Sequence, residues 1–423
     1  MLYHAVMRAS SASRIAAVLA ASIFLWSCAR YRPAPIDAAV LTTGAVTQER
    51  DGVRVSVVVP SDDDVERLFG VRLTEYGIQP VGFVITNDSK DFYWFAHLAV
   101  DPDYFTPMEA ANRARYFFGD SADEEIREHF LKSAIGSYVG AGQTISGFMF
   151  TNLSRGVKPV NVDLIAPHRL LTFYFTIHVP NLEVEYSHVD VDTLYPADQI
   201  RDVSPEELRS AIEAMPCCAT NEDGKGVQDP LNFVIVGEPG EALSSLVRTG
   251  WHVSSVLRTR SAMKTFWSYF FSSQYKYAPV SPIYLLGRRQ DLALQKARET
   301  ARERNHLRVW RTPLRCEGKP VWIGQISRDI GLTFSWKTIV GHEVDSDVDE
   351  ARNYLAQDML RSQGLERFGW VKGVGAASTA EPHHMDDGTP FFTDGLRVVL
   401  WFGKPPISLD EIQVLPWEKP PPR

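Results

Sequence analysis

The chain has 423 residues and a formal net charge of -8 at pH 7. With 44% hydrophobic and 11% aromatic residues, it is long and apolar enough for two or three domains that each have a core, which excludes a disordered chain. The excess of acidic residues argues against nucleic acid as a partner, because a phosphate backbone is bound by a basic face.

The first residues are typical of an export signal. Residues 1–14 contain Arg8 and Arg14 and no acidic residue. Residues 15–26 form an apolar stretch that is too short to cross a bilayer as a permanent helix. This pattern predicts a signal peptide.

The end of the apolar stretch carries a second signal. Residues 25–28 read Leu-Trp-Ser-Cys, which resembles the lipobox of bacterial lipoproteins, where the cysteine is acylated before cleavage. We therefore expect a signal peptide over residues 1–27 and lipidation of Cys28, with an ordinary secreted form or an uncleaved anchor as alternatives. Ala29 in place of Asp favours the outer membrane, facing the periplasm.

Residues 28–48 contain two prolines and few large apolar residues, which predicts a tether between the membrane and the first domain. No later segment has eighteen consecutive apolar residues, so we expect the lipid to be the membrane anchor.

Residues 49–200 are predicted to form an immunoglobulin-like β-sandwich with a helical insertion. Apolar residues alternate with period two in several short runs, which is typical of strands buried on one face. These runs begin at Val53, Val81, Tyr93, Val160 and Leu171. Residues 107–116 and 122–139 have helical patterns and form the predicted insertion.

Residues 201–228 are predicted to be a helix followed by an interdomain linker. Ser204 and Glu207 have the spacing of a capping box, and Pro205 would occupy the first helical position. The polar, glycine-containing stretch 220–229 would be the linker.

The second domain is expected over residues 229–404, with an extended proline-rich tail over 405–423. It opens with an apolar strand at 231–236 and a helix at 241–250, which indicates a mixed α/β (α+β) fold.

Three cysteines follow Cys28. A bridge between the neighbours Cys217 and Cys218 would be strained, while one of them could reach Cys316 and leave the other free; the sequence leaves the redox state of the three open. No Cys or His spacing is typical of zinc.

Several motifs follow one another along the second domain: residues 216–218, 229–237, 281–288 with 290–293, 306–310, 321–324 with Asp329, His342 with Asp345, Asp347 and Asp349, and 393–395. In content and order they resemble the LssY C-terminal domain family over roughly residues 229–403. In that family the domain is often fused to membrane phosphatases of the phosphatidic acid type or to other membrane segments. The resemblance implies a domain type without implying a reaction.

Two predicted strands carry the main candidate site. His306, Arg308 and Trp310 share one strand face, and the next strand presents Gln325, Ser327 and Asp329 on one face. A reversal at Glu317-Gly318 would place His306 opposite Asp329 and Arg308 opposite Ser327.

A histidine beside a carboxylate is held in one tautomer and is a better base, so His306 and Asp329 are the candidate catalytic pair. His342, on a third predicted strand, would converge on the same surface and add to a binding or metal site. The interpretation we prefer is a polar network that fixes the strand register, with no metal bound.

Other polar groups have plainer explanations. Arg288 and Asp291 are candidate anion-binding residues, although a strand end that turns into a helix over 292–304 explains them equally well. Asp345, Asp347 and Asp349 alternate as acids do in a calcium loop, but the glycine and the distal glutamate of such a loop are missing. We expect a helix N-cap with acids in the first turn instead.

Two further stretches, residues 383–387 and 261–272, are unusual in composition. His383 and His384, with Asp386 and Asp387, are expected in a solvated loop. Residues 261–272 predict a helix with an aromatic face, which would lie on a lipid surface, cover a groove or pack in the core.

We therefore expect an envelope lipoprotein with a binding or accessory role and no cofactor. Its partners would be the membrane, through the lipid on Cys28, and an envelope protein, lipid or glycan close to the membrane. The alternative is a hydrolase acting on a lipid, glycan or phosphoester through His306 and Asp329, with Arg288 and Arg308 holding an anion.

Overall fold

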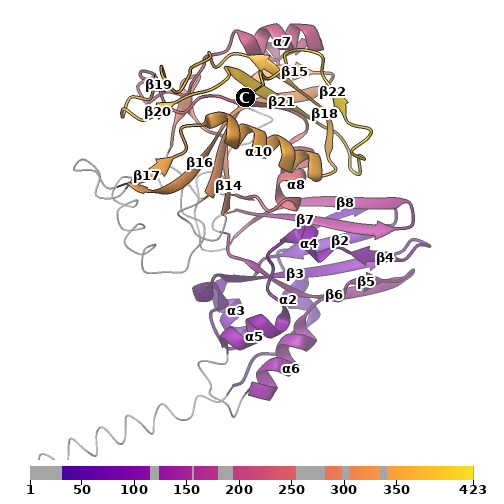
Figure 1. Ribbon diagram of the computed structural model, residues 1–423. Helices are drawn as coiled ribbons and strands as arrows, with labels where there is room; N and C mark the ends of the chain where they lie inside the picture. Colours follow the sequence, from indigo (N-terminus) through magenta and orange to yellow (C-terminus); the bar gives the residue numbers. More distant parts are fainter. Residues whose placement is uncertain are drawn as a thin grey trace, which may run out of the picture.

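The computed structural model describes residues 31–114, 123–154, 157–179, 194–253, 282–297, 304–333 and 341–422. The predicted signal peptide, Cys28 and the aromatic stretch 261–272 lie outside these residues. None of the helices within the described ranges is long and apolar enough to cross a membrane. We call residues 31–179 the N-terminal unit and residues 194–422 the C-terminal unit (Figure 1).

The N-terminal unit contains two antiparallel sheets, each of four strands among the described residues. The first has the order β1-β2-β3-β6, with β1 (Val46–Arg50), β2 (Val53–Val58), β3 (Ile78–Asn87) and β6 (Gln143–Asn152). The second has the order β5-β4-β7-β8, with β5 (Tyr138–Val139), β4 (Tyr93–Phe95), β7 (Val157–Ala166) and β8 (Arg169–His178). The predicted alternating runs therefore lie on strands.

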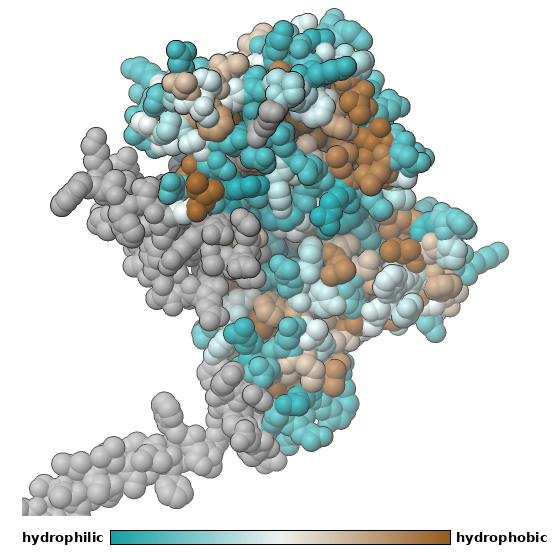
Figure 2. All heavy atoms as spheres, viewed as in Figure 1, coloured by the Kyte–Doolittle hydropathy of each residue, from teal (hydrophilic) through white to brown (hydrophobic). Residues whose placement is uncertain are grey.

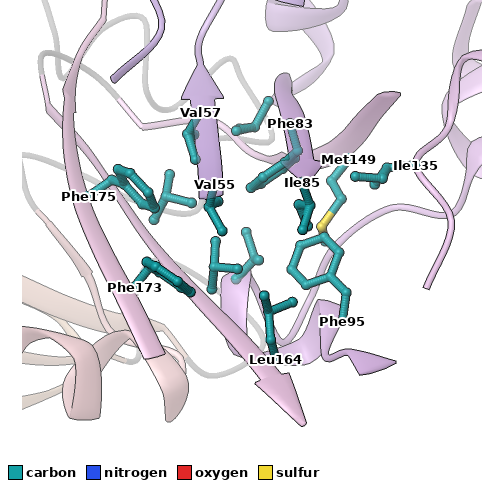
Figure 3. Packing of buried hydrophobic residues seen from close by; sticks show 14 of the residues in the cluster. Val55, Val57, Phe83, Ile85, Phe95, Ile135, Met149, Leu164, Phe173 and Phe175 are labelled. Atoms are coloured by element: carbon teal, nitrogen blue, oxygen red, sulfur yellow. The ribbon is translucent and has the colours of Figure 1, made fainter. Parts of the chain in front are cut away.

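Both sheets contribute to one hydrophobic core (Figure 3). Val55 and Phe83 enter it from the first sheet, and Phe95, Leu164 and Phe173 enter it from the second. Successive side chains of a strand point to opposite faces, so the period-two pattern sends every second residue into this core.

Helices cover the outer face of the first sheet. They are α3 (Asp62–Phe69), η1 (Leu73–Tyr76), α5 (Pro107–Ala114) and α6 (Asp123–Ser133), and they pack on Phe148 and Phe150 of β6. The second predicted helix is shorter than expected, because β5 begins within its range. A short helix, α4 (His97–Val100), follows β4 directly.

The described part of the predicted tether, residues 31–48, is packed on the N-terminal unit, so the tether prediction is wrong there. Tyr31 is buried among the helices, and Leu41 of α2 (Ala38–Thr42) is buried as well. The backbone N–H of Ala34 donates to the carbonyl of Arg67 at 2.8 Å. Ile36 and Val40 pack against the same cluster, so four apolar side chains among small and proline residues hold this segment.

The C-terminal unit is built on one mixed sheet of ten strands among the described residues. The main path runs β11-β14-β15-β16-β10-β21-β18-β22, with β17 beside β16 and β9 beside β15. The strands are β9 (Arg201–Val203), β10 (Phe233–Val236), β11 (His252–Val253), β14 (Leu292–Ala297), β15 (Arg304–Cys316), β16 (Lys319–Thr333), β17 (Gly341–Val344), β18 (Leu365–Lys372), β21 (Leu396–Phe402) and β22 (Gln413–Val414).

Two short hairpins lie outside this sheet. They are β12 (Tyr284–Leu285) with β13 (Arg288–Arg289), and β19 (His383–His384) with β20 (Pro390–Phe391).

Helices cover both faces of the large sheet (Figure 1). On one face, α8 (Pro239–Arg248) and α10 (Val348–Arg361) pack on strand residues such as Phe233 and Leu307. On the other, α7 (Pro205–Glu213) packs on residues such as Val234 and Trp310. Gly324 is needed in β16, because a Cβ there would lie 2.1 Å from the ring of Phe233.

Residues 201–228, predicted to separate the domains, pack on the C-terminal unit. The capping box of Ser204 and Glu207 is present at the start of α7, as predicted. However, β9 pairs with β15, and the backbone of Thr220 bonds that of Tyr284, so the stretch 220–229 is no free linker. The polar, glycine-containing sequence of this stretch is typical of a linker, but it is equally typical of turns on the surface of a domain.

The predicted helix over 292–304 is wrong: β14 occupies Leu292–Ala297 and pairs with β15. Leu292 and Leu294 face the core beneath α8 and α10, and this alternation of period two outweighed the helix-forming composition.

The pairing that the sequence left open is the one between neighbours. Cys217 and Cys218 form a vicinal disulfide, and Cys316 is a buried free cysteine at the end of β15.

Polar contacts join the two units. Arg248, the last residue of α8, donates from Nε and Nη2 to Asp163 of β7 at 2.8 and 3.1 Å; the Asp163 side chain is buried and that of Arg248 is 14% exposed. The hydroxyl of Ser244 donates to Asn161 at 2.6 Å. Because a bidentate pair fixes both distance and orientation, these contacts hold α8 against β7 in one geometry.

Candidate functional site

The candidate site lies on the hairpin of β15 and β16. The hairpin turns at Glu317 and Gly318, as predicted, with φ angles of 50° and 78°. Next to the turn Cys316 pairs with Lys319, which is the predicted register.

The register shifts by two residues further from the turn, between Arg311 and Arg315. Pro313 lies in this interval and has no N–H to donate to the ladder. The prediction that His306 lies directly opposite Asp329 is therefore wrong, since His306 lies opposite Ser327.

The predicted shared face is nevertheless correct, because a shift of two residues returns every side chain to the same face. Arg308 lies opposite Gln325 instead of Ser327, and Arg304 lies opposite Asp329. Gln295 of β14, opposite His306, extends the row onto a third strand.

His306 is held between a hydroxyl and a carboxylate. Its Nε2 lies 2.8 Å from Ser327 Oγ, and its Nδ1 lies 3.5 Å from Asp329 Oδ1. The three residues are 6%, 2% and 2% exposed. Serine, histidine and aspartate thus follow one another in the order found in hydrolase triads.

Arginine and amide groups surround this chain of contacts. Arg304 donates from Nε to Asp329 Oδ2 at 2.9 Å and from Nη1 to Gln295 Oε1 at 2.7 Å. Gln325 donates from Nε2 to Ser327 Oγ at 2.6 Å and accepts from Arg308 Nη1 at 2.8 Å.

Asp229, which precedes β10, completes the cluster. Its carboxylate accepts from Gln325 at 3.1 Å and lies 3.8 Å from Arg308 Nη1. Burial raises the pKa of Asp229, against the opposing effects of Arg308 and a hydrogen bond from Ser327. The ionised form of this carboxyl therefore costs stability at neutral pH.

We call these eight residues the polar cluster: Asp229, Gln295, Arg304, His306, Arg308, Gln325, Ser327 and Asp329. With a neutral histidine, its two arginines and two aspartates balance in formal charge. Its contacts are mainly with one another, which is the condition under which buried polar groups are tolerated.

The cluster gives Ser327 competing roles. Its oxygen accepts from Gln325 Nε2 and also lies 2.8 Å from His306 Nε2, where the histidine tautomer decides which of the two atoms donates. Ser327 is therefore in contact with both Gln325 and His306 within the cluster.

The other predicted binding residues lie elsewhere. Arg288 pairs with Asp291 and contacts the hydroxyl of Tyr195 at 3.1 Å, so its charge is compensated within the protein. Burial raises the pKa of Asp291. Trp310 is fully buried beneath α7, with its indole N–H 3.3 Å from the carbonyl of Arg288.

His342 lies on β17 opposite Leu332 of β16, and its side chain is outside what the structure describes. Asp347 caps α10 and accepts from the N–H of Asp349, as the N-cap interpretation predicted. His383 and His384 are exposed, on β19 instead of a loop.

No group of three or more His, Cys, Asp or Glu side chains that could hold a metal occurs among the described residues.

Sequence reasoning missed three members of the cluster. Arg304 and Gln295 continue the period-two faces of β15 and β14, so a longer strand with its neighbour correctly assigned would have included them. Asp229 directly precedes Pro230 and opens the motif 229–237, but no alternation of residues links it to the faces of β15 and β16.

The fold and the polar cluster define the C-terminal unit as an α+β domain with helices on both faces of a mixed sheet. The family model for the LssY C-terminus matches residues 210–396. This unit therefore contains an LssY C-terminal domain, as the sequence motifs predicted. No curated protein matches the chain.

Proposed function

We propose that the protein is a bacterial envelope lipoprotein with a binding or accessory role. It is cleaved before Cys28, acylated there, and held at the outer membrane facing the periplasm. The lipobox-like residues 25–28 after a short apolar stretch support this proposal. Its partner is an envelope protein, lipid or glycan, and nucleic acid and cofactors have no part in it.

The observation that carries the non-catalytic role is the burial of the polar cluster. His306, Ser327 and Asp329 are at most 6% exposed and are engaged by neighbouring side chains. Since a hydrolase must bring its substrate to the nucleophile and base, this arrangement supports a network that fixes the β15–β16 register.

A surface row on the N-terminal unit supports binding. Tyr138, Trp94 and Ile165 lie side by side across β5, β4 and β7, and all three are exposed. Exposed aromatic residues in contact with one another are typical of protein interfaces. We propose that the unit is an immunoglobulin-like sandwich whose outer face meets the partner.

The order Ser327, His306, Asp329 favours the second candidate function, a hydrolase acting on a lipid, glycan or phosphoester. In that case His306 is the base and Ser327 the nucleophile.

The anchor is tested by Cys28→Ala. We expect the wild type to incorporate labelled palmitate and to sediment with membranes, and the variant to lose both, because acylation of this thiol supplies the membrane affinity. Cys316→Ala is the matched control and should change neither. Wild-type levels of Cys28→Ala in the membrane fraction would contradict the proposal.

A further inference from the structure

The N-terminal segment enters the fold close to the proposed lipid. Tyr31 is 5% exposed and packs in the apolar cluster beneath α3, α5 and α6. The edge of its ring meets His129 of α6, with the ring centroids 5.9 Å apart. Together with the bond between Ala34 and Arg67, this contact fixes the start of the described chain against these helices.

Only three peptide steps separate Tyr31 from Cys28. A fully extended chain spans about 3.3–3.6 Å per residue, so the two Cα atoms are at most about 11 Å apart. An acyl chain on Cys28 inserts into the hydrocarbon region of the bilayer. The three residues that follow Cys28 therefore keep Tyr31 close to the lipid headgroups.

The C-terminal unit lies at the opposite end of the molecule. In Figure 1 the helices α3, α5 and α6 form the lower end, and α8 meets β7 on the far side of the two sheets. The ion pair of Arg248 and Asp163 holds that contact. A rigid connection between the units therefore carries the LssY C-terminal domain away from the end at which the lipid enters.

We propose that the end formed by α3, α5 and α6 faces the bilayer, and that the LssY C-terminal domain projects away from it. This inference rests on the proposed acylation of Cys28. It places the partner of the LssY C-terminal domain on the side away from the anchoring membrane, in contrast to the membrane-proximal partner that the sequence suggested.

The charges at the end formed by α3, α5 and α6 indicate that the covalent lipid, and not attraction to charged headgroups, holds this end at the bilayer. Exposed acids occur in the first turns of α3 and α6, including Asp62, Asp63, Glu124 and Glu125. The lower end of the molecule is mostly hydrophilic in Figure 2, although Leu131 of α6 is also exposed. Because anionic lipids repel carboxylates, the short covalent connection must hold this end in place, and anionic lipid should not be required.

Energy transfer to a lipid-bound acceptor dye tests the orientation in the full acylated chain. A donor dye is placed on Lys132→Cys at the end of α6 or on Asp223→Cys in the C-terminal unit, two exposed positions. The disulfide of Cys217 and Cys218 and the burial of Cys316 direct the dye to the new thiol. Vesicles contain only zwitterionic phospholipid.

We expect strong transfer from Lys132→Cys and loss of most of it from Asp223→Cys. A long Gly/Ser insertion between Arg30 and Tyr31 should reduce the difference between the two sites. If the acylated, membrane-bound protein shows equal transfer from both sites, the orientation is wrong while the anchor stands. If the protein carries no lipid and does not bind vesicles, the proposed function fails and the orientation with it.

Discussion

Arg304→Met is expected to lower the free energy of unfolding by about 3–5 kcal/mol. The guanidinium of Arg304 and the carboxylate of Asp329 are 2.9 Å apart, with side chains 4% and 1% exposed. Removing the cation leaves a buried carboxylate without its main counter-charge, and methionine supplies no donor to Gln295. Chemical denaturation monitored by tryptophan fluorescence measures the change.

Two variants make this test specific. Arg315→Met removes an exposed ion pair with Asp202 at the other end of the same strand and should leave the melting temperature nearly unchanged. Asp329→Leu combined with Arg304→Met removes both buried charges and should recover much of the loss. An Arg304→Met protein as stable as Arg315→Met would show that the polar cluster does not stabilise the sheet.

Arg248→Met should uncouple the two units. The side chain makes two bonds to Asp163 and a third, at 2.7 Å, to the carbonyl of Ser362. Because Asp163 is buried and Arg248 nearly so, breaking the pair should cost up to about 3 kcal/mol. We expect calorimetry to resolve two unfolding transitions where the wild type shows one, because each unit keeps its own core.

The control for this variant is Arg169→Met, on β8 of the same sheet as Asp163. Arg169 pairs with Asp51 at 2.9 Å on the surface, so its loss should leave a single transition. Two transitions in the wild type, or one in Arg248→Met at the wild-type temperature, would contradict a rigid connection between the units.

Much of the fold follows from local pattern. Strands such as β2 and β8 were predictable because burial alternates along them. The capped start of α7 was predictable because Ser204, Pro205 and Glu207 have fixed roles there. Residues 31–48 were not, since only four scattered apolar side chains, Tyr31, Ile36, Val40 and Leu41, hold a segment whose composition is typical of a tether.

The sequence was sufficient to predict which side chains of the candidate site share a face of the sheet, but not which residues lie opposite one another on β15 and β16. Alternation placed His306, Ser327 and Asp329 on one surface, and the turn at Glu317 set the first pairs correctly. The two-residue shift near Pro313 arises where proline has no N–H for the hydrogen bonds between the strands. Pairing residues by their distance from the turn assumes an unbroken register, so it could not predict this shift. Asp229 reached the cluster through the fold alone.

The most direct test of the central claim compares Ser327→Ala with the wild type in two measurements. The polar cluster as a structural network predicts a lower melting temperature for Ser327→Ala, because His306 and Gln325 lose a buried partner. It also predicts that neither the wild type nor the variant accelerates the hydrolysis of p-nitrophenyl esters and phosphoesters above the spontaneous rate in buffer. Hydrolysis by the wild type that Ser327→Ala loses at an unchanged melting temperature would contradict the account and establish the hydrolase.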